Sequence, residues 1–531
     1  MHSHSPILLG IAFVALIAAL TAFGRRLPVP APVLQVLAGL ALGFLPDVTV
    51  PELEPDLVFF VFLPPILWAA AYFTSLREFK ANRRPIALLA VGLVVATTLG
   101  VAWVARALFP GMPWAVAVAL GAIVSPPDAV AAAAVVSRLP VPRRVIVILE
   151  GESLVNDASA LVLYRSAVVA AVTGVFSLGA SIVRFFVDAG VGTLVGLLVG
   201  WLFIRAARRT RDELVETLLL LAAPYAAWMI AETLHVSAVL ACVAGGLYVR
   251  QHLSTAITPK SRLQSNTVWE VLIFVLNAMI FVLLGMQFAT LLRTSTPDEL
   301  PHFLVPGLII SFVVIVARLV WVPIVGYLPR LFDGDRARRD TVAPKAVMLV
   351  AWTSMRGIVS LATALALPLT LADGSAFPFR EEVLYVTMSV ILVTLVVQGC
   401  SLAPIIRAFN FQPETRHHDE EQFARVEALR RASEELEDAA REGALSQTDV
   451  AWLRSELRER MEYHRNPQAA QARHHVRSRM REAERRLLVR LRNEGAISDE
   501  VLRELEQELD LDALRGNHVD ANTNPRQVAA H

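Results

Sequence analysis

A cluster of acidic and polar residues lies inside an otherwise apolar stretch, Ile148–Leu163. It contains Glu152, Ser153, Asn156 and Asp157 at positions where a membrane span would be uniformly apolar. An ionisable group near the bilayer centre costs at least a few kcal/mol, so such groups are rarely placed there without a partner or a task. Carboxylate, hydroxyl and carbonyl oxygens are the ligands of hard cations. The stretch therefore predicts a site that binds small cations within a membrane.

Asp157 is the best candidate for the group that carries the ion. It lies roughly 21 Å into its predicted span at 1.5 Å per residue, which is near the middle of the bilayer. Burial in a low-dielectric site raises the pKa of a carboxyl group, so that protons can compete with cations near neutral pH. We expect proton and cation to displace one another at this group. The alternative is a carboxylate that forms a salt bridge and only supports packing.

Asp128 is a second candidate, at a similar depth in a predicted span that is interrupted at Ser125-Pro-Pro-Asp128. Prolines lack the N–H donor and break the hydrogen-bond ladder of a helix. Carbonyl groups freed by the break, such as those of Ser125 and Pro127, could add cation ligands. In the alternative interpretation, the carboxylate of Asp128 only satisfies freed N–H groups.

Glu152 and Arg356 are predicted to form a structural ion pair. An arginine deep in a span needs a partner, and Glu152 lies five residues before Asp157, on a different face of the helix. The pair would hold the span of Glu152 against the interrupted span of Arg356. The alternative is that Glu152 itself takes up protons.

The composition shows what kind of protein must position these residues. Of the 531 residues, 55% are hydrophobic and 18% are charged, whereas a soluble protein carries about 25% charged residues. We therefore predict an all-α membrane domain over residues 1–410 and a charged cytoplasmic tail over residues 411–531, disordered at its end. The net charge of +1 gives no reason to expect a nucleic-acid partner, and Cys242 and Cys400 do not suggest a disulfide framework.

About thirteen apolar windows are long enough to cross a bilayer. They cover roughly residues 6–23, 30–46, 56–74, 85–108, 113–137, 143–172, 178–204, 213–233, 237–250, 266–292, 303–328, 343–371 and 381–409.

Basic residues are concentrated in alternate loops between these windows. Such loops contain Arg25 and Arg26, Arg83 and Arg84, Arg143 and Arg144, Arg208 and Arg209, and Arg338 and Arg339. Cytoplasmic loops carry an excess of Lys and Arg. This alternation therefore predicts a protein of the cytoplasmic (inner) membrane, with its N-terminus outside the cell and its tail in the cytoplasm.

Two windows are interrupted in mid-span, at Pro126-Pro127 and at Arg356-Gly357. They are seven spans apart and so run in opposite directions. Paired interruptions in oppositely oriented halves are typical of transporters with inverted repeats and a site at the midplane. In another window, Gly192, Gly196 and Gly200 recur every four residues, which predicts close packing against a neighbouring helix.

Four groups of motifs resemble the bacterial sodium/proton exchangers of the monovalent cation:proton antiporter-1 family. They are Phe62-Leu-Pro-Pro-Ile-Leu67 with Leu76-Arg-Glu-Phe79, Ser125-Pro-Pro-Asp-Ala-Val130, Glu150-Gly-Glu-Ser-Leu-Val-Asn-Asp157, and Met355-Arg-Gly-Ile-Val-Ser-Leu361 with Thr394-Leu-Val-Val-Gln-Gly399.

The resemblance implies thirteen spans, two crossed broken helices and a homodimer that works by alternating access. It maps the cation ligands onto Asp128, Ser153 and Asp157, and the glutamate–arginine pair onto Glu152 and Arg356. In this family an Asn-Asp pair, here Asn156 and Asp157, accompanies electroneutral exchange. No cofactor is implied beyond the transported ions.

The sequence departs from the family pattern at two places. Some members have Thr where this chain has Pro127, so that only the backbone carbonyl of Pro127 could contribute a ligand. Some have a glutamate soon after the Pro-Pro of the third span, a region that here reads Trp68-Ala-Ala-Ala-Tyr72.

We therefore predict a secondary transporter that exchanges Na⁺, or else Li⁺ or K⁺, for H⁺ and serves pH homeostasis. Two alternatives from other classes are a passive cation channel and an intramembrane aspartyl hydrolase that uses Asp128 and Asp157 as a dyad. The hydrolase would require a Gly-x-Gly-Asp site, which the sequence lacks.

Overall fold

The computed structural model describes most of the chain at the level of individual residues. The described residues are 15–20, 22, 24, 29–45, 50, 54–136, 139–174, 178–210, 212–294, 299–332, 343–371, 374–411, 415–443, 445–465, 467–494, 496–498, 500–502, 505–506 and 508–510.

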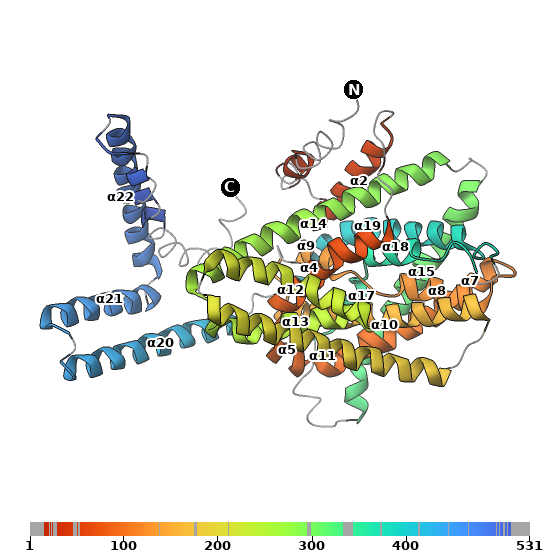
Figure 1. The fold of residues 1–531 in the computed structure, drawn as a ribbon, viewed down its shortest axis with the longest axis horizontal. Helices are drawn as coiled ribbons and strands as arrows, with labels where there is room; N and C mark the ends of the chain where they lie inside the picture. Colours follow the sequence, from red (N-terminus) through yellow and green to blue (C-terminus); the bar gives the residue numbers. More distant parts are fainter. Residues whose placement is uncertain are drawn as a thin grey trace. The chain divides into compact units, whose positions relative to one another are not determined.

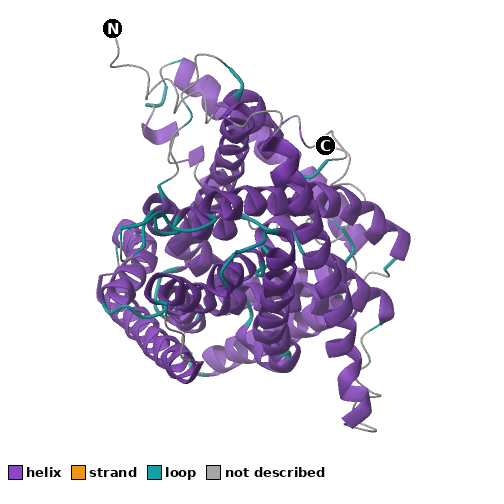
Figure 2. Ribbon diagram, turned by 90° about the vertical axis from the view of Figure 1, so that its right-hand side faces the viewer, coloured by secondary structure: helices purple, strands orange, loops and turns teal. Residues whose placement is uncertain are grey.

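Every regular element in these ranges is a helix, and none of the described residues forms a strand (Figures 1 and 2). The chain divides into two compact units, Met1–Pro413 and Glu414–His531. The helical fold that the apolar windows predict is confirmed.

In the first unit, each predicted window after the first contains at least one helix. The helices are α2 (Ala31–Gly43), α3 (Pro55–Leu57), η1 (Val58–Phe62), α4 (Leu63–Phe73), α5 (Leu76–Ala81), α6 (Arg83–Ala87), η2 (Leu88–Leu93), α7 (Val94–Leu108), α8 (Trp114–Val124), α9 (Ala129–Val136), α10 (Arg143–Thr173), α11 (Leu178–Thr210), α12 (Glu213–Thr233), α13 (Ala238–His252), η3 (Leu253–Thr255), α14 (Pro259–Thr294), α15 (Glu299–Phe332), α17 (Pro344–Trp352), α18 (Ile358–Leu365) and α19 (Arg380–Phe409). The first window lies largely outside the described residues. Six of the described helices or continuous helical segments are long and apolar enough to cross a membrane unbroken.

The helix α10, which carries the acidic cluster, runs unbroken for 31 residues. Pro142 precedes its first turn, where a proline's missing N–H is harmless. Gly174 ends it in a left-handed conformation with φ of 72°, which glycine adopts without a steric penalty. The helix packs against α8, and Glu152, Asn156 and Asp157 are buried inside the helical bundle.

The glycine repeat on α11 packs against α13, as the sequence predicts. A Cβ atom added to Gly196 would lie 2.1 Å from the carbonyl oxygen of Ala241, and one added to Gly192 would lie 2.5 Å from that of Ser237. Glycine therefore allows the two backbones to approach closely, which is typical of helix pairs in membranes. The prediction of close helix packing is confirmed.

The second unit contains three charged helices, α20 (Thr415–Arg441), α21 (Gln447–Arg465) and α22 (Pro467–Asn493). Ion pairs along and between the first two include Arg430 with Glu427 at 2.5 Å and Arg454 with Glu437 at 2.6 Å. The hydrogen bond from Arg430 lowers the pKa of the Glu427 carboxyl group. Few of the described side chains of this unit are buried, so these ion pairs lie at its surface.

Candidate ion-binding site

The first interrupted span consists of two half-helices. The half-helix α8 ends at Val124 and α9 begins at Ala129, so that Ser125 to Asp128 connect them in a non-helical conformation. Pro126 and Pro127 cannot donate to a helical ladder. Non-helical backbone at membrane depth is tolerated only where protein buries it or water fills a cavity, and Ser125 is fully buried.

The second interrupted span has the same construction. The half-helix α17 ends at Trp352 and α18 begins at Ile358, with the residues from Thr353 to Gly357 between them. All five connecting residues are buried.

The two breaks meet directly. The backbone N–H of Asp128 donates a hydrogen bond of 2.7 Å to the carbonyl oxygen of Met355. A Cβ atom added to Gly357 would lie 1.8 Å from Oδ2 of Asp128, so only glycine permits this approach. The pairing satisfies backbone groups that the breaks leave without helical partners.

Charged side chains match the dipoles of the half-helices. Oδ1 of Asp128 accepts a 2.8 Å hydrogen bond from the N–H of Val130, in the first turn of α9. The guanidinium of Arg356 donates to the carbonyl oxygens of Val124 at 2.9 Å and Ser125 at 3.0 Å, at the C-terminal end of α8. Negative groups stabilise helix N-termini and positive groups stabilise C-termini.

Asp128 therefore does part of what its alternative interpretation predicts, since one of its oxygens caps α9. Its second oxygen lies against Gly357.

Arg356 makes further hydrogen bonds in the second break. Its guanidinium donates to Ser354, and its backbone N–H donates to Oγ1 of Thr394 on α19 at 3.1 Å. The guanidinium of Arg356 is thus occupied by the ends of both broken helices.

Asn156 connects α10 to the first break. Its Nδ2 donates a 3.0 Å hydrogen bond to the carbonyl oxygen of Pro127. Its Oδ1 is buried and has no hydrogen-bond partner among the described residues. The carbonyl of Pro127, expected as a possible cation ligand, therefore already accepts one hydrogen bond.

Asp157 follows directly on α10 and is buried, with 6% of its surface exposed. Within the described parts of the chain, its carboxylate has neither an ion pair nor a hydrogen bond. Asp128 is the neighbouring ionisable group whose charge acts on it. Ser153 lies one turn earlier on α10 and is half-buried. The structure links Asn156 to the first break by its hydrogen bond and Asp157 to Asp128 through charge.

The predicted pairing of Glu152 with Arg356 is wrong as to the partner. The guanidinium of Arg318, on α15, forms a bidentate ion pair with the Glu152 carboxylate, and one of its two contacts measures 2.7 Å. Nε of Arg318 donates to the carbonyl oxygen of Val350 at 3.0 Å. Glu152 is thus neutralised by Arg318, whereas carbonyl groups bind Arg356.

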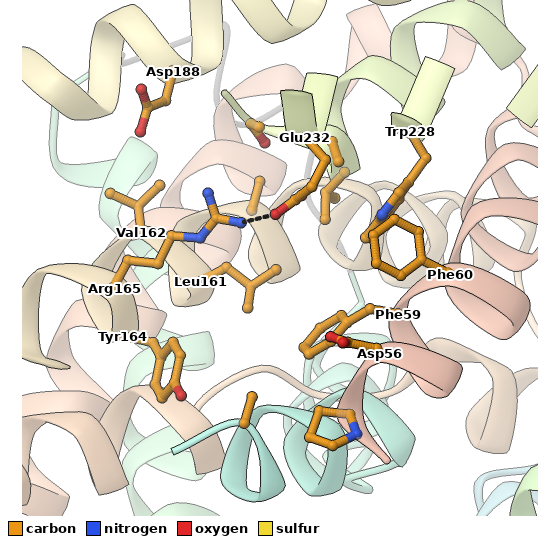
Figure 3. Close-up of a pocket in the computed structure, with 16 residues that line it drawn as sticks. Asp56, Phe59, Phe60, Leu161, Val162, Tyr164, Arg165, Asp188, Trp228 and Glu232 are labelled. Carbon is orange, nitrogen blue, oxygen red and sulfur yellow. Dashed lines mark hydrogen bonds and ion pairs between the residues drawn. The ribbon is translucent and has the colours of Figure 1, made fainter. Parts of the chain in front are cut away.

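A cavity of about 230 Å³ is lined by α10 residues that follow Asp157 in the chain, among them Leu161 and Arg165 (Figure 3). Its wall includes Ala158, the next residue after Asp157, and Arg165, two turns further along. Nη2 of Arg165 lies 3.4 Å from Oε1 of Glu232, at the end of α12. Sequence reasoning gave Arg165 no role, although it is a charge inside the sixth apolar window.

The described residues contain no cluster of side chains that could hold a metal ion as a permanently bound cofactor. No group of three or more His, Cys, Asp and Glu side chains there is arranged to hold a metal ion.

Comparison with known proteins identifies the family. The family profile described as "Sodium/hydrogen exchanger, transmembrane" matches residues 12–408. The chain belongs to the sodium/hydrogen exchanger family. An uncharacterised Na⁺/H⁺ exchanger of Mycobacterium tuberculosis is 35% identical over 523 residues, which cover 95% of this chain and 96% of the relative.

Two further comparisons agree with this membership. A sodium, potassium, lithium and rubidium/H⁺ antiporter of Bacillus pumilus is 32% identical, over 81% of this exchanger and 66% of the relative. The sodium proton antiporter MjNhaP1 of Methanocaldococcus jannaschii has a similar fold, with a TM-score of 0.61 at 19% identity, over 78% of this exchanger and all of that chain.

The exchanger is therefore a multi-pass membrane transporter rather than an enzyme. The sequence prediction of a cation/proton antiporter is confirmed, and the alternatives of an aspartyl hydrolase and a passive channel are not supported.

Proposed function

We propose that the protein exchanges one Na⁺ for one H⁺ at Asp157, without net charge movement. The observation that carries this proposal is the contrast in partners around the site. Glu152 is paired with Arg318, Asp128 caps α9, and Arg356 binds carbonyl groups, whereas the buried Asp157 carboxylate has no partner among the described residues.

A buried charge without a partner is unstable, so that Asp157 must bind either a proton or a cation. The two ligands compete for the same oxygens, and this competition couples their transport. The loaded site carries the same charge in both cases, because Na⁺ and H⁺ carry the same charge. Asn156 adds no charge, and this is the basis for electroneutral exchange.

The proposed Na⁺ ligands are oxygens of Asp157, Asp128 and Ser153. The unpartnered Oδ1 of Asn156 adds a further oxygen near the first break. Sodium-sized cations bind such mixed sets of carboxylate, hydroxyl and carbonyl oxygens. The hydrogen bond from Asn156 to Pro127 would keep the helix of Asp157 aligned with the break of Asp128.

The membrane arrangement follows from charge and length. We assign residues 1–410 to the transporter domain, with thirteen spans in the cytoplasmic membrane and the N-terminus outside. Residues 411–531 form the cytoplasmic tail, and a homodimer that works by alternating access is the proposed assembly. The positive-inside distribution of Arg and Lys supports this orientation.

K⁺/H⁺ exchange is the second candidate. The Bacillus pumilus relative is named for sodium, potassium, lithium and rubidium. We therefore propose that this chain exchanges a monovalent cation for protons, and that Na⁺ is the first cation to test.

Proton flux in proteoliposomes tests the proposal. A pH gradient is imposed, and Na⁺, Li⁺ or K⁺ is added with and without a potassium/valinomycin voltage clamp. We expect cation-driven proton movement that the clamp does not change, and none with Asp157→Asn. Voltage-dependent exchange would refute electroneutrality, and exchange by Asp157→Asn would refute the carrier assignment.

A further inference from the structure

The cavity beside α10 contains an uneven set of charges. Three carboxylates line it, those of Asp56, Asp188 and Glu232, and Arg165 is the one basic residue among the lining side chains (Figure 3). Arg184 approaches Asp188 at 3.6 Å. The cavity wall is therefore net negative, and a narrow space lined by one sign of charge raises the local concentration of the opposite ion.

The cavity also has room and polar groups for water. About 230 Å³ is space for several water molecules at roughly 30 Å³ each. The carboxylates of Asp56, Asp188 and Glu232 and the guanidinium of Arg165 line it and supply the polar groups that such water can bind.

The position of the cavity relates it to the proposed carrier group. Ala158, Leu161 and Arg165 line it from α10 at intervals of three and four residues, and so share one helix face. Asp157 adjoins the inner end of this row. Arg165 lies about 12 Å beyond Asp157 along the helix axis, on the side away from Arg143, which begins α10 at the cytoplasmic end in the proposed orientation.

Arg165 connects the carrier helix to α12 across this cavity. Its contact with Glu232 measures 3.4 Å, and 45% and 38% of the two side chains are exposed. A pair with this exposure is strongly screened by water and is easily broken. The guanidinium of Arg165 can therefore either neutralise Glu232 or move away, so that the Glu232 carboxylate is free to attract a cation.

We propose that Arg165 and Glu232 set the access of cations from the external side. Arg165 neutralises one of three vestibule carboxylates and so limits how strongly the cavity attracts hydrated monovalent cations. This inference rests on the proposed exchange at Asp157, and assigns Arg165 a positioning and electrostatic role, since it does not touch the transported ion at the carrier group.

The two partners should have opposite effects on transport. Without the Arg165 charge, Glu232 attracts cations together with Asp56, so the external Na⁺ concentration for half-maximal exchange should fall about three- to tenfold. Without the Glu232 charge, Arg165 is left uncompensated and that concentration should rise. If the pair only linked α10 to α12 structurally, both variants would instead shift the external Na⁺ concentration for half-maximal exchange in the same direction.

The experiment compares Arg165→Gln and Glu232→Gln in right-side-out and inside-out membrane vesicles. Na⁺-dependent proton flux gives the half-saturating concentration on each side and the maximal rate. We expect opposite shifts on the external side, unchanged values on the cytoplasmic side, and wild-type values for Arg165→Lys. The shifts should shrink at high ionic strength, because added salt screens exposed charges.

Arg106→Gln is the matched control. Arg106 lies at the opposite end of the helical segment Arg83–Leu108 from Arg83, which is the external side in the proposed orientation. Its guanidinium lies over the ring of Trp114, and Arg106 is not among the residues that line the cavity. Equal shifts from Arg106→Gln and Arg165→Gln would refute the proposal, as would shifts of the same sign from both partners or equal shifts on both membrane sides. A wild-type protein without cation-coupled proton flux would instead refute the proposed exchange at Asp157.

Discussion

Two buried carboxylates on α10 are five residues apart and have opposite surroundings. Glu152 is 1% exposed and forms a bidentate ion pair with Arg318. Asp157 is 6% exposed and has no such partner in the described structure. The difference teaches that burial alone does not separate the two roles that we propose for these carboxylates, because Glu152 has a fixed cationic partner and Asp157 does not.

The largest expected effect comes from Asp157→Asn. Exchange should fall more than 100-fold, because an amide cannot release a proton to accept a cation; general acid–base groups contribute on this order elsewhere. Thermal stability in detergent should be unchanged or increased, since the variant removes an unpaired buried charge. A marked loss of folded protein would instead give Asp157 the structural role that we assign to Glu152.

Glu152→Gln should have the next largest effect, on stability. Removing one partner leaves the Arg318 charge buried, which costs about 3–5 kcal/mol. Thermal unfolding in detergent and the yield of folded protein measure this loss. The double variant Glu152→Gln with Arg318→Met should recover most of it, since it removes both charges. A stable Glu152→Gln protein without exchange would show that Glu152 itself takes up protons.

Gly357→Ala tests the geometry around Asp157 without altering its chemistry. The new Cβ atom would lie 1.8 Å from Oδ2 and 2.8 Å from Cβ of Asp128, so the Asp128 side chain must rotate and the backbone that carries it must shift, at a cost of about 1–3 kcal/mol. We expect a clear loss of exchange rate together with lower thermal stability. Gly190→Ala is the control, because nothing lies within 4 Å of a Cβ atom added there; equal behaviour of both variants would contradict the close approach.

Thr394→Val should have the smallest effect. It removes the acceptor for the N–H of Arg356 at 3.1 Å while keeping the shape of the side chain, so we expect a loss of about 1 kcal/mol in stability. Exchange should continue at a rate near that of the wild type. Loss of exchange at full stability would place Thr394 in the ion pathway.

Much of the architecture could be predicted because apolar length and proline position are local signals. Pro126-Pro127 and Arg356-Gly357 each indicated a break that the structure contains. Asp157 and Asn156 stood out because polar residues are rare in apolar spans. Their chemistry therefore required no knowledge of the packing.

The choice of partner could not be predicted, because it depends on packing between distant helices. Two arginines, Arg318 and Arg356, lie deep in predicted spans, and the sequence alone does not say which of them faces Glu152. The carbonyl groups freed at the first break were the useful signal, since they need hydrogen-bond donors and favour Arg356 there; the sequence analysis assigned them to the transported cation instead. The contact between Arg165 and Glu232 likewise depends on how α10 and α12 are placed.

The hydrogen bond between Asp128 and Met355 has a consequence for biosynthesis. The two residues are 227 positions apart in the sequence, so at 5–20 residues per second the ribosome needs on the order of 10 to 50 s to make the chain between them. During that time, the first break is in or near the membrane, and its backbone groups and Asp128 cannot yet form hydrogen bonds with the second break. We therefore expect water or other polar groups to satisfy the backbone of the first break until α17 and α18 have been made.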